Sequence, residues 1–355
     1  MKQRFIYLAL VVMLFVSCEE YYKPTLEVVP PLLVVEAHLT NDLKQNFVRL
    51  SKSEDFYNVN QSEEVKDAIV YLEEVGGPTS MAVEKETGYF TFSQTPVAGK
   101  KYRLRISYQH DIYESEVVTM PPLPRIDTLY TNYKVEKSYR KDSFGKLHQI
   151  QIPSREICID APITNELQHY RFTYQAVLQW MYTTKAAPGV QSTMYFGWVW
   201  KYDNGLFNIA GPKEFSVSTQ VKNYPILSLA YDKNVYLDSA DQSAMGWIVN
   251  IDQYGISRES YKMHEKLNKQ FSAEGSLFEP ILSQVYGNIH CTTDSSKIAL
   301  GFFDLNSYHQ YRYFINLGFN DTSKVILRQL NRYEYIPRDT SFTVNYPPKF
   351  WESNY

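Results

Sequence analysis

The sequence predicts a mainly β protein, with an N-terminal Ig-like or transthyretin-like β-sandwich followed by a larger antiparallel β domain with one inserted helix. Three observations indicate this class. Short runs of alternating apolar and polar residues recur along the chain, turn residues separate these runs, and only one segment carries convincing helix signals. The chain also contains 30 Tyr and 19 Phe, whose rings suit half-buried strand faces.

Residues 1–17 have the pattern of a lipoprotein signal peptide. Lys2 and Arg4 form a positive start, and residues 6–16 are an unbroken apolar run. This run is shorter than the roughly 20 residues that span a bilayer, but it suits a secretory signal. A small residue then precedes Cys18, which we expect to become the acylated N-terminus. The alternatives are an ordinary cleaved signal with an incidental cysteine and an N-terminal anchor helix.

Residues 18–31 contain three prolines and are predicted to be a lipid-anchored tether. Residues 32–120 follow as the predicted β-sandwich domain, because strand-like runs alternate with polar turns throughout. In residues 101–108 the alternation places Tyr102 and Ile106 on one face. The strands are expected at residues 32–39, 46–52, 67–75, 81–84, 88–92, 101–108 and 112–118.

Residues 121–128 contain three prolines, which cannot donate ladder hydrogen bonds, and we predict a Pro-rich connector there. Residues 129–355 are predicted to form the larger antiparallel β domain. Its one helix is expected over residues 258–273, with Ser257 as the N-cap and Gly275 as the stop. Strands are expected at residues 129–135, 149–160, 168–184, 194–202, 224–230, 235–237, 246–253, 284–290, 297–304, 311–317 and 324–335.

The run over residues 168–184 has the clearest period of two in the chain. Its polar residues, including Gln175 and Gln179, share one face, which is predicted to be exposed to water. Tryptophan and tyrosine side chains in this run and the next flank a polar loop. They could bind a sugar, a peptide or a receptor, or they could fill the core of the domain. The residues are Trp180, Tyr182, Tyr195, Trp198 and Trp200.

If Cys18 carries acyl chains, two cysteines remain, and both lie in strand-like runs. In an oxidising compartment Cys158 and Cys291 could form a disulfide. Two separate buried thiols are the alternative, and the sequence does not decide between them.

No motif for catalysis, metal binding or cofactor binding is present. The chain has no phosphate loop, dinucleotide fingerprint or nucleophile elbow. His264 and Glu265 begin like a zinc-protease motif, but Asn268 stands where the second histidine would be. With 36 basic and 39 acidic residues and no basic cluster, nothing indicates nucleic-acid binding. We therefore expect no enzyme activity, no cofactor and no metal.

A set of short motifs occurs in a fixed order along the chain, at residues 34–36, 39–40, 88–90, 99–106, 113–115, 120–122, 126–127, 285–289 and 299–303. Together these motifs resemble a Bacteroidota outer-membrane lipoprotein family known only as a domain of unknown function. Ala37 is one departure, because the family more often has Gly there. The genes of that family often lie beside TonB-dependent receptors.

The resemblance implies a lipoprotein of the outer membrane that works with, or beside, a TonB-dependent receptor. Glu19 and Glu20 resemble the acidic export signal that sends such lipoproteins to the cell surface. The expected function is an accessory or ligand-capturing subunit of a TonB-dependent nutrient uptake system, with the ligand unknown. The alternatives are a structural or adhesive envelope lipoprotein without a transported ligand and, less favoured, a hydrolase with an unrecognised site. The family has no established catalytic residues to carry over.

Overall fold

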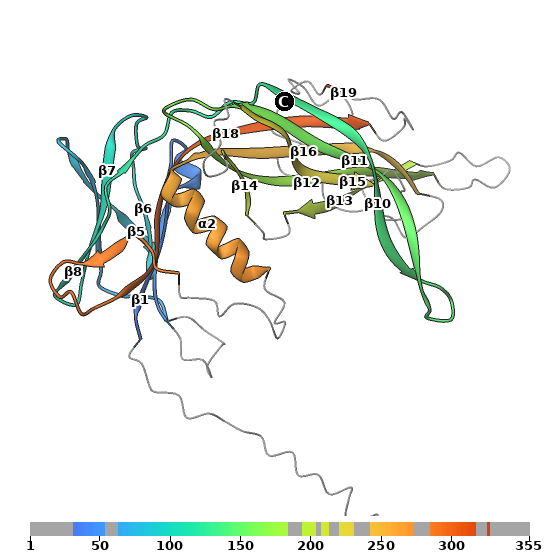
Figure 1. Cartoon of the computed structure of the whole chain (residues 1–355). Helices are drawn as coiled ribbons and strands as arrows, with labels where there is room; N and C mark the ends of the chain where they lie inside the picture. Colours follow the sequence, from blue (N-terminus) through green and yellow to red (C-terminus); the bar gives the residue numbers. More distant parts are fainter. Residues whose placement is uncertain are drawn as a thin grey trace, which may run out of the picture.

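Strands dominate the protein, and the mainly β prediction is confirmed. The computed structural model describes residues 31–53, 63–183, 194–203, 207–212, 220–230, 242–272, 285–316 and 325–326. Figure 1 shows two β-sandwiches joined end to end, with helix α2 (Arg258–Phe271) beside the joint. The predicted signal peptide, the tether before residue 31 and the strand at 235–237 lie outside the described residues.

The first sandwich consists of two sheets that face each other across an apolar core. One sheet begins with the first part of β18 (Ala299–Asn316) and has the order β18-β1-β2-β6-β5. The other sheet begins with β17 (Ile289–Cys291) and has the order β17-β8-β7-β3-β4, with β9 paired to β7. Its N-terminal elements are β1 (Leu33–Thr40), a 3-10 turn (Leu43–Gln45), β2 (Phe47–Lys52), β3 (Ile69–Glu74), β4 (Thr79–Met81), β5 (Val83–Glu86), β6 (Tyr89–Thr91), β7 (Lys101–Tyr108), β8 (Asp111–Ser115) and β9 (Val118–Thr119).

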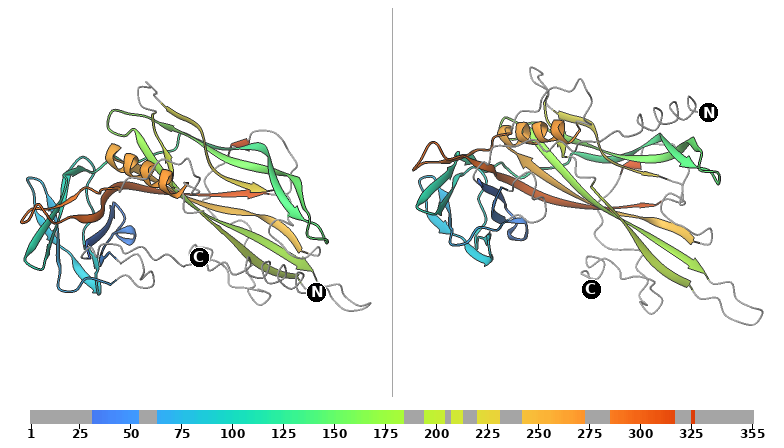
Figure 2. Two further views of the ribbon diagram at one scale, coloured as in Figure 1. Left: turned by 60° about the horizontal axis from the view of Figure 1, so that its bottom comes forward. Right: turned by 90° about the horizontal axis from the view of Figure 1, so that it is seen from below.

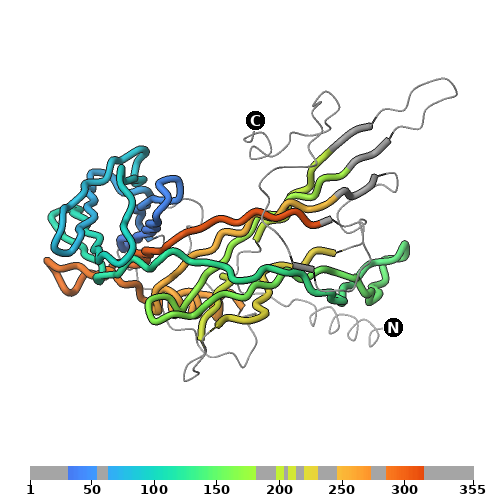
Figure 3. The backbone as a smooth tube through the Cα atoms, turned by 90° about the horizontal axis from the view of Figure 1, so that it is seen from above, coloured from blue at the N-terminus to red at the C-terminus, as the bar shows by residue number. Residues whose placement is uncertain are grey.

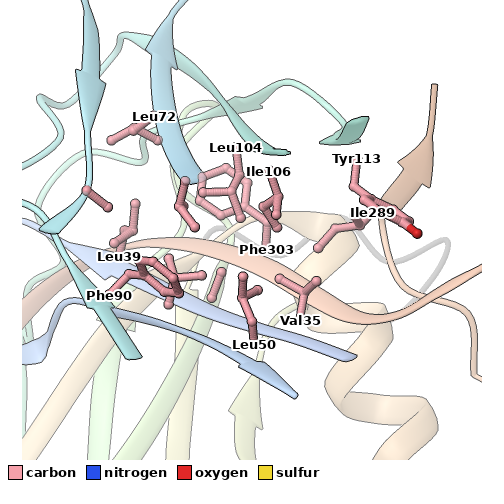
Figure 4. Close-up of a cluster of buried hydrophobic side chains, with 14 of the residues drawn as sticks. Val35, Leu39, Leu50, Leu72, Phe90, Leu104, Ile106, Tyr113, Ile289 and Phe303 are labelled. Atoms are coloured by element: carbon pink, nitrogen blue, oxygen red, sulfur yellow. The ribbon is translucent and has the colours of Figure 1, made fainter. Parts of the chain in front are cut away.

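The core of this sandwich also takes residues from the far end of the described chain. Ile289 and Phe303 pack with Val35, Leu50 and Leu104, and all five side chains are buried (Figure 4). The hydrophobic effect drives their burial without regard to their separation in sequence. Apolar residues between positions 289 and 305 therefore complete the core of the first sandwich. In the sequence they come after the proline connector, far from the other residues of that core.

The second sandwich packs the sheet β15-β11-β10-β19 against the strands β13-β12-β16-β18. Trp247 is its largest fully buried side chain. The elements are β10 (Thr128–Lys141), β11 (Leu147–Pro162), β12 (His169–Thr183), β13 (Met194–Tyr202), β14 (Asn208–Ala210), β15 (Gln220–Ala230), β16 (Gln242–Ile256), α2 (Arg258–Phe271), β17 (Ile289–Cys291), β18 (Ala299–Asn316) and β19 (Val325–Ile326).

Strand β18 belongs to both sandwiches. Its first part pairs in parallel with β1, from Leu33 opposite Ala299 to Thr40 opposite Asn306. Its second part pairs antiparallel with β16, starting at Ser307 opposite Gly255. Figures 2 and 3 show this strand running from one sandwich into the other. The two strands predicted at 297–304 and 311–317 are thus one strand, because every residue between them is paired with β1 or β16. Asn306 and Ser307, at the change of partner, are also fully buried.

The helix prediction is confirmed. Helix α2 begins after Ser257, whose Oγ accepts a hydrogen bond of 3.0 Å from the backbone N–H of Ser260. It ends at Phe271, two residues before the predicted end.

The prediction of one exposed face on β12 is wrong at Gln179, which is fully buried. A second small cluster of Val177, Trp198 and Ile248 covers that face of the sheet.

Candidate functional site

A cleft of about 810 Å³ lies where the two sandwiches meet, and we call it the junction cleft. Residues 98–99 and 116–122 form the wall from the first sandwich. The opposite wall comes from residues 165–166 and 168–169 and from residues 256–259 at the start of α2. Clefts between structural units are a common place for small-ligand sites, because two walls can supply groups of different chemistry.

The proline connector forms part of the cleft wall and is held in place by three hydrogen bonds to the second sandwich. Ser307 Oγ donates to the carbonyl oxygen of Pro122 at 2.6 Å, and Gln253 Nε2 donates to that of Arg125 at 3.1 Å. The backbone N–H of Ile126 donates to the hydroxyl of Tyr311 at 3.1 Å. The connector is therefore fixed along β16 and β18, which gives the cleft a defined wall.

His169, at the start of β12, is the most deeply buried titratable side chain that lines the cleft, with 8% of its surface exposed. Its ring packs against Tyr261 of α2 at a centroid distance of 4.7 Å. Burial and the nearby Arg258 lower the pKa of His169, so the ring is neutral at neutral pH. A neutral imidazole offers one donor and one acceptor to a ligand.

The charged residues that line the cleft are mostly acidic. Glu116, Glu166 and Glu259 line the cleft together with Arg258. The N-terminus of α2 adds partial positive charge at the same place. The described side chains of the cleft thus provide donors, acceptors and an excess of negative charge, which suit a small polar or cationic ligand. They do not include a nucleophile hydrogen-bonded to a base.

A buried polar network stands behind the cleft and fixes the first turn of α2 to β18. Ser260 Oγ donates to Asp304 Oδ1 at 2.7 Å. Because this bond uses the only hydroxyl proton, Nδ1 of His264, 3.3 Å from the same oxygen, must carry a proton to bond with it. All three side chains are buried. None of the three side chains lines the junction cleft, and the bond from Ser260 to Asp304 ties α2 to β18.

The electrostatics of the network keep one carboxylate charged inside the protein. Burial alone would raise the pKa of Asp304, but it lies well below its usual range. The lowering comes first from the interaction with the His38 ring, whose Nδ1 lies 3.8 Å from Oδ2, and then from the nearby His264 and Arg171. Burial lowers the pKa of His264, against the effect of Asp304. A negative charge is thus held at the joint, where β18 passes between the sandwiches.

The aromatic residues predicted as a contact surface are not gathered on one open face. Trp180 is buried on the face towards the second core, where its ring lies directly over Gly197. Trp198 is also buried but on the opposite face, and half-buried Trp200 stacks on Tyr202 there at 5.9 Å. Of the other two, Tyr182 and Tyr195, the structure describes only the backbone, where they are paired.

Cys158 and Cys291 are both free, buried thiols. Cys158 lies in β11 of the second sandwich, where burial raises its pKa to about 12. Cys291 lies in β17 of the first sandwich, 3.4 Å from the hydroxyl of Thr293. Of the two alternatives that the sequence left open, the structure has the separate thiols.

Cys18, Glu19 and Glu20 lie outside the described residues. Within the described ranges, no group of three or more His, Cys, Asp or Glu side chains could hold a metal ion. No helix in the same part of the chain is long and apolar enough to cross a membrane.

Sequence reasoning did not identify the junction cleft. The only signal for it was the proline connector at 121–128, which marks a place where two units meet. His169 gave no signal by itself, because isolated histidines are scattered over the chain and its neighbours in the cleft come from other segments.

Comparison with known proteins gives one result. The family model described as Domain of unknown function (DUF4249) matches residues 19–312. No match is found among curated proteins or solved structures. The match covers most of the chain, including both walls of the junction cleft and the part of β18 that pairs with β1. The chain therefore belongs to the family described as Domain of unknown function (DUF4249).

Proposed function

We propose that the protein is an outer-membrane lipoprotein, held at the cell surface by acyl chains on Cys18, that serves a TonB-dependent nutrient uptake system as an accessory or ligand-capturing subunit. The observation that carries this proposal is the N-terminal sequence. A positive start, an apolar run and a small residue lead directly to Cys18, and the family match begins at the next residue. Glu19 and Glu20 follow, as in an acidic surface-export signal.

Anchorage at Cys18 is physically sufficient for such a protein. One acyl chain binds a membrane only marginally, whereas two or more hold it stably, since each buried CH₂ contributes about 0.8 kcal/mol. A multiply acylated cysteine followed by a tether would leave both sandwiches in the aqueous phase.

The junction cleft supports the ligand-capturing role. It is large enough for a small molecule, and its lining combines the neutral ring of His169 with Arg258 and several carboxylates. Such a mixed set of donors and acceptors favours reversible binding of a polar nutrient through hydrogen bonds. In the proposed role the cleft would hold this ligand close to the receptor that imports it.

The test is gentle detergent extraction of the tagged protein from its own membranes, followed by mass spectrometry of the N-terminal peptide and of the partners that co-purify. We expect a peptide that begins at acylated Cys18 and a large β-barrel receptor in the eluate. The Cys18→Ser variant is the control and should lose both the acyl chains and the membrane association.

Each part of the proposal can fail separately. A mature N-terminus without acyl chains would refute the anchor. An acylated protein that elutes alone and monodisperse would refute the receptor partnership. Complete resistance of the body to protease on intact cells would place it on the inner side of the outer membrane.

A further inference from the structure

The hairpin formed by β10 and β11 extends beyond the second sandwich as a two-stranded ribbon that pairs with no other strand of the described residues. The two strands pair with each other from Thr128 opposite Asp160 to Lys141 opposite Leu147. Their other described neighbours stop earlier, since β15 reaches only Ser154 and β19 contacts only residues 130–131. Seven residue pairs, from Val135 opposite Pro153 to Lys141 opposite Leu147, therefore project beyond the described neighbouring strands. This corresponds to about 23 Å. Figure 1 shows this ribbon curving away from the body.

The turn at the end of the ribbon is well defined. Asp142 Oδ1 accepts hydrogen bonds from the backbone N–H groups of Phe144 and Lys146, both at 2.9 Å. Its Oδ2 lies 2.8 Å from Nε2 of His148. Gly145 has a φ of +80°, which glycine adopts without strain. These interactions hold the turn in one shape and leave Phe144 at its apex.

The side chains at this end are apolar and exposed. Phe144 has 94% of its surface exposed, Tyr139 67% and Leu147 58%. Tyr139 faces Gln149 and Lys141 faces Leu147 across the ribbon, so the tyrosine and the leucine share one face. Large apolar side chains concentrated at the end of a rigid projection indicate a contact surface.

The same end carries positive charge in an acidic protein. Between residues 134 and 148 there are five Lys and Arg residues and two acids, although the whole chain has a net charge of −3. One of the acids, Asp142, is already engaged by the turn and His148. Lys137, Lys141 and Lys146 form no ion pair among the described residues. Aromatic rings between lysines are the composition of segments that lie in the interface of an anionic membrane.

The position of the ribbon agrees with its composition. In Figure 1 the turn of the ribbon and the start of β1 are the two lowest points of the described chain. Seen from below, in the right panel of Figure 2, the first sandwich and the ribbon lie at opposite ends of the described chain. The segment that leads to Cys18 precedes β1 in the sequence, and the ribbon reaches towards the same side as the start of β1.

We propose that the tip of the β10–β11 hairpin is a second membrane contact, which inserts Phe144 into the headgroup region of an anionic lipid surface while the lysines bind lipid phosphates. This inference extends the proposed anchorage at Cys18 and rests on it for the orientation of the body. Two contacts far apart would fix the orientation of the body on the membrane, whereas a tether alone would leave it free to rotate. The mouth of the junction cleft would then face a constant direction.

The test places an environment-sensitive fluorophore on Ser143→Cys, next to the apex, in the full protein reconstituted into phosphatidylcholine vesicles that contain a minority of phosphatidylglycerol. The control carries the same label on Val75→Cys, at the far end of the first sandwich from Pro31. The N–H of Val75 donates to the carbonyl oxygen of Lys101, so Val75 lies beside the first residue of β7. Pro31 lines a groove together with Tyr108, the last residue of β7, so it lies at the opposite end of the sandwich.

We expect a blue shift at position 143 and none at position 75. Phe144→Ser should abolish the shift, and each substitution of Lys137, Lys141 or Lys146 by Gln should weaken insertion about fivefold. An emission at position 143 that is the same with and without vesicles would overturn the proposal. A shift that appears only with a co-purified outer-membrane protein would also overturn it and identify a protein as the partner.

Failure of the anchor can be distinguished from failure of the hairpin. A protein without acyl chains would not reconstitute, which refutes the proposed anchor. The hairpin would still be tested by adding the same vesicles to that protein, because insertion of the tip does not need the lipid on Cys18.

Discussion

Gly301 offers a direct test of the strand that joins the two sandwiches. It has a φ of +100°, and a Cβ at this position would lie 1.9 Å from the carbonyl oxygen of Val35 in β1. The obstacle is backbone, so alanine can be accommodated only by displacing β1 from β18. We expect about 1–3 kcal/mol of backbone strain and about 1 kcal/mol for each of the one or two ladder hydrogen bonds that are lost. Gly301→Ala should therefore reduce the free energy of unfolding by about 2–5 kcal/mol.

Gly99→Ala is the matched control. Gly99 also has a positive φ, +81°, but nothing lies within 4 Å of a Cβ built there. This variant carries the backbone strain without the collision, so we expect a loss of about 1–2 kcal/mol. Urea unfolding of both variants, followed by far-UV circular dichroism, measures the difference. Equal destabilisation of the two variants would refute the close approach of β1 and β18 at this position.

Three further predictions concern the buried groups. Ser260→Ala should cost about 1–3 kcal/mol in urea unfolding, because the Asp304 carboxylate loses its 2.7 Å donor and stays buried; a neutral effect would contradict the network. Folding lowers the pKa values of both His264 and Asp304 below their ordinary values of 6.5 and 3.8. Each group therefore contributes its full stabilisation of the folded state above its ordinary pKa, and this contribution is lost as the pH falls through its pKa in the folded protein. The melting temperature should therefore fall on acidification below about pH 6.5, and less so in His264→Asn, whereas an equal slope in both proteins would argue against a buried neutral His264. Cys158 and Cys291 should not react with Ellman's reagent in the native protein and should both react in denaturant without reductant; their absence of reaction after unfolding would indicate a disulfide.

Local features of the fold could be predicted from the sequence. The alternation in β7 and β12 reflects the two faces of a strand, and Ser257 marks the start of α2 because its side chain can accept a hydrogen bond from the first turn. These signals are short-range. They depend on residues a few positions apart, which the sequence displays directly.

The joint could not be predicted in this way. Asn41 and Tyr308 exchange hydrogen bonds across 267 positions of sequence, and no local pattern indicates such a pairing. The burial of Gln179 could not be predicted from the sequence either. A polar residue in an alternating run predicts a solvent-exposed face, and only the tertiary structure shows the second cluster that covers it. The junction cleft combines residues from separate segments, so only the tertiary structure reveals it.

The shared strand has a consequence for the order in which the chain can fold during synthesis. The first sandwich needs Phe303 and Leu305 to complete its core, and these residues emerge long after β1 to β9. Until then the edge of β1 that later pairs with β18 remains open, and an open edge can pair with another chain. The N-terminal half therefore cannot finish folding ahead of the rest, as N-terminal domains generally do. We expect nascent chains that stop before β17 to aggregate, and the completed protein to unfold in a single cooperative transition.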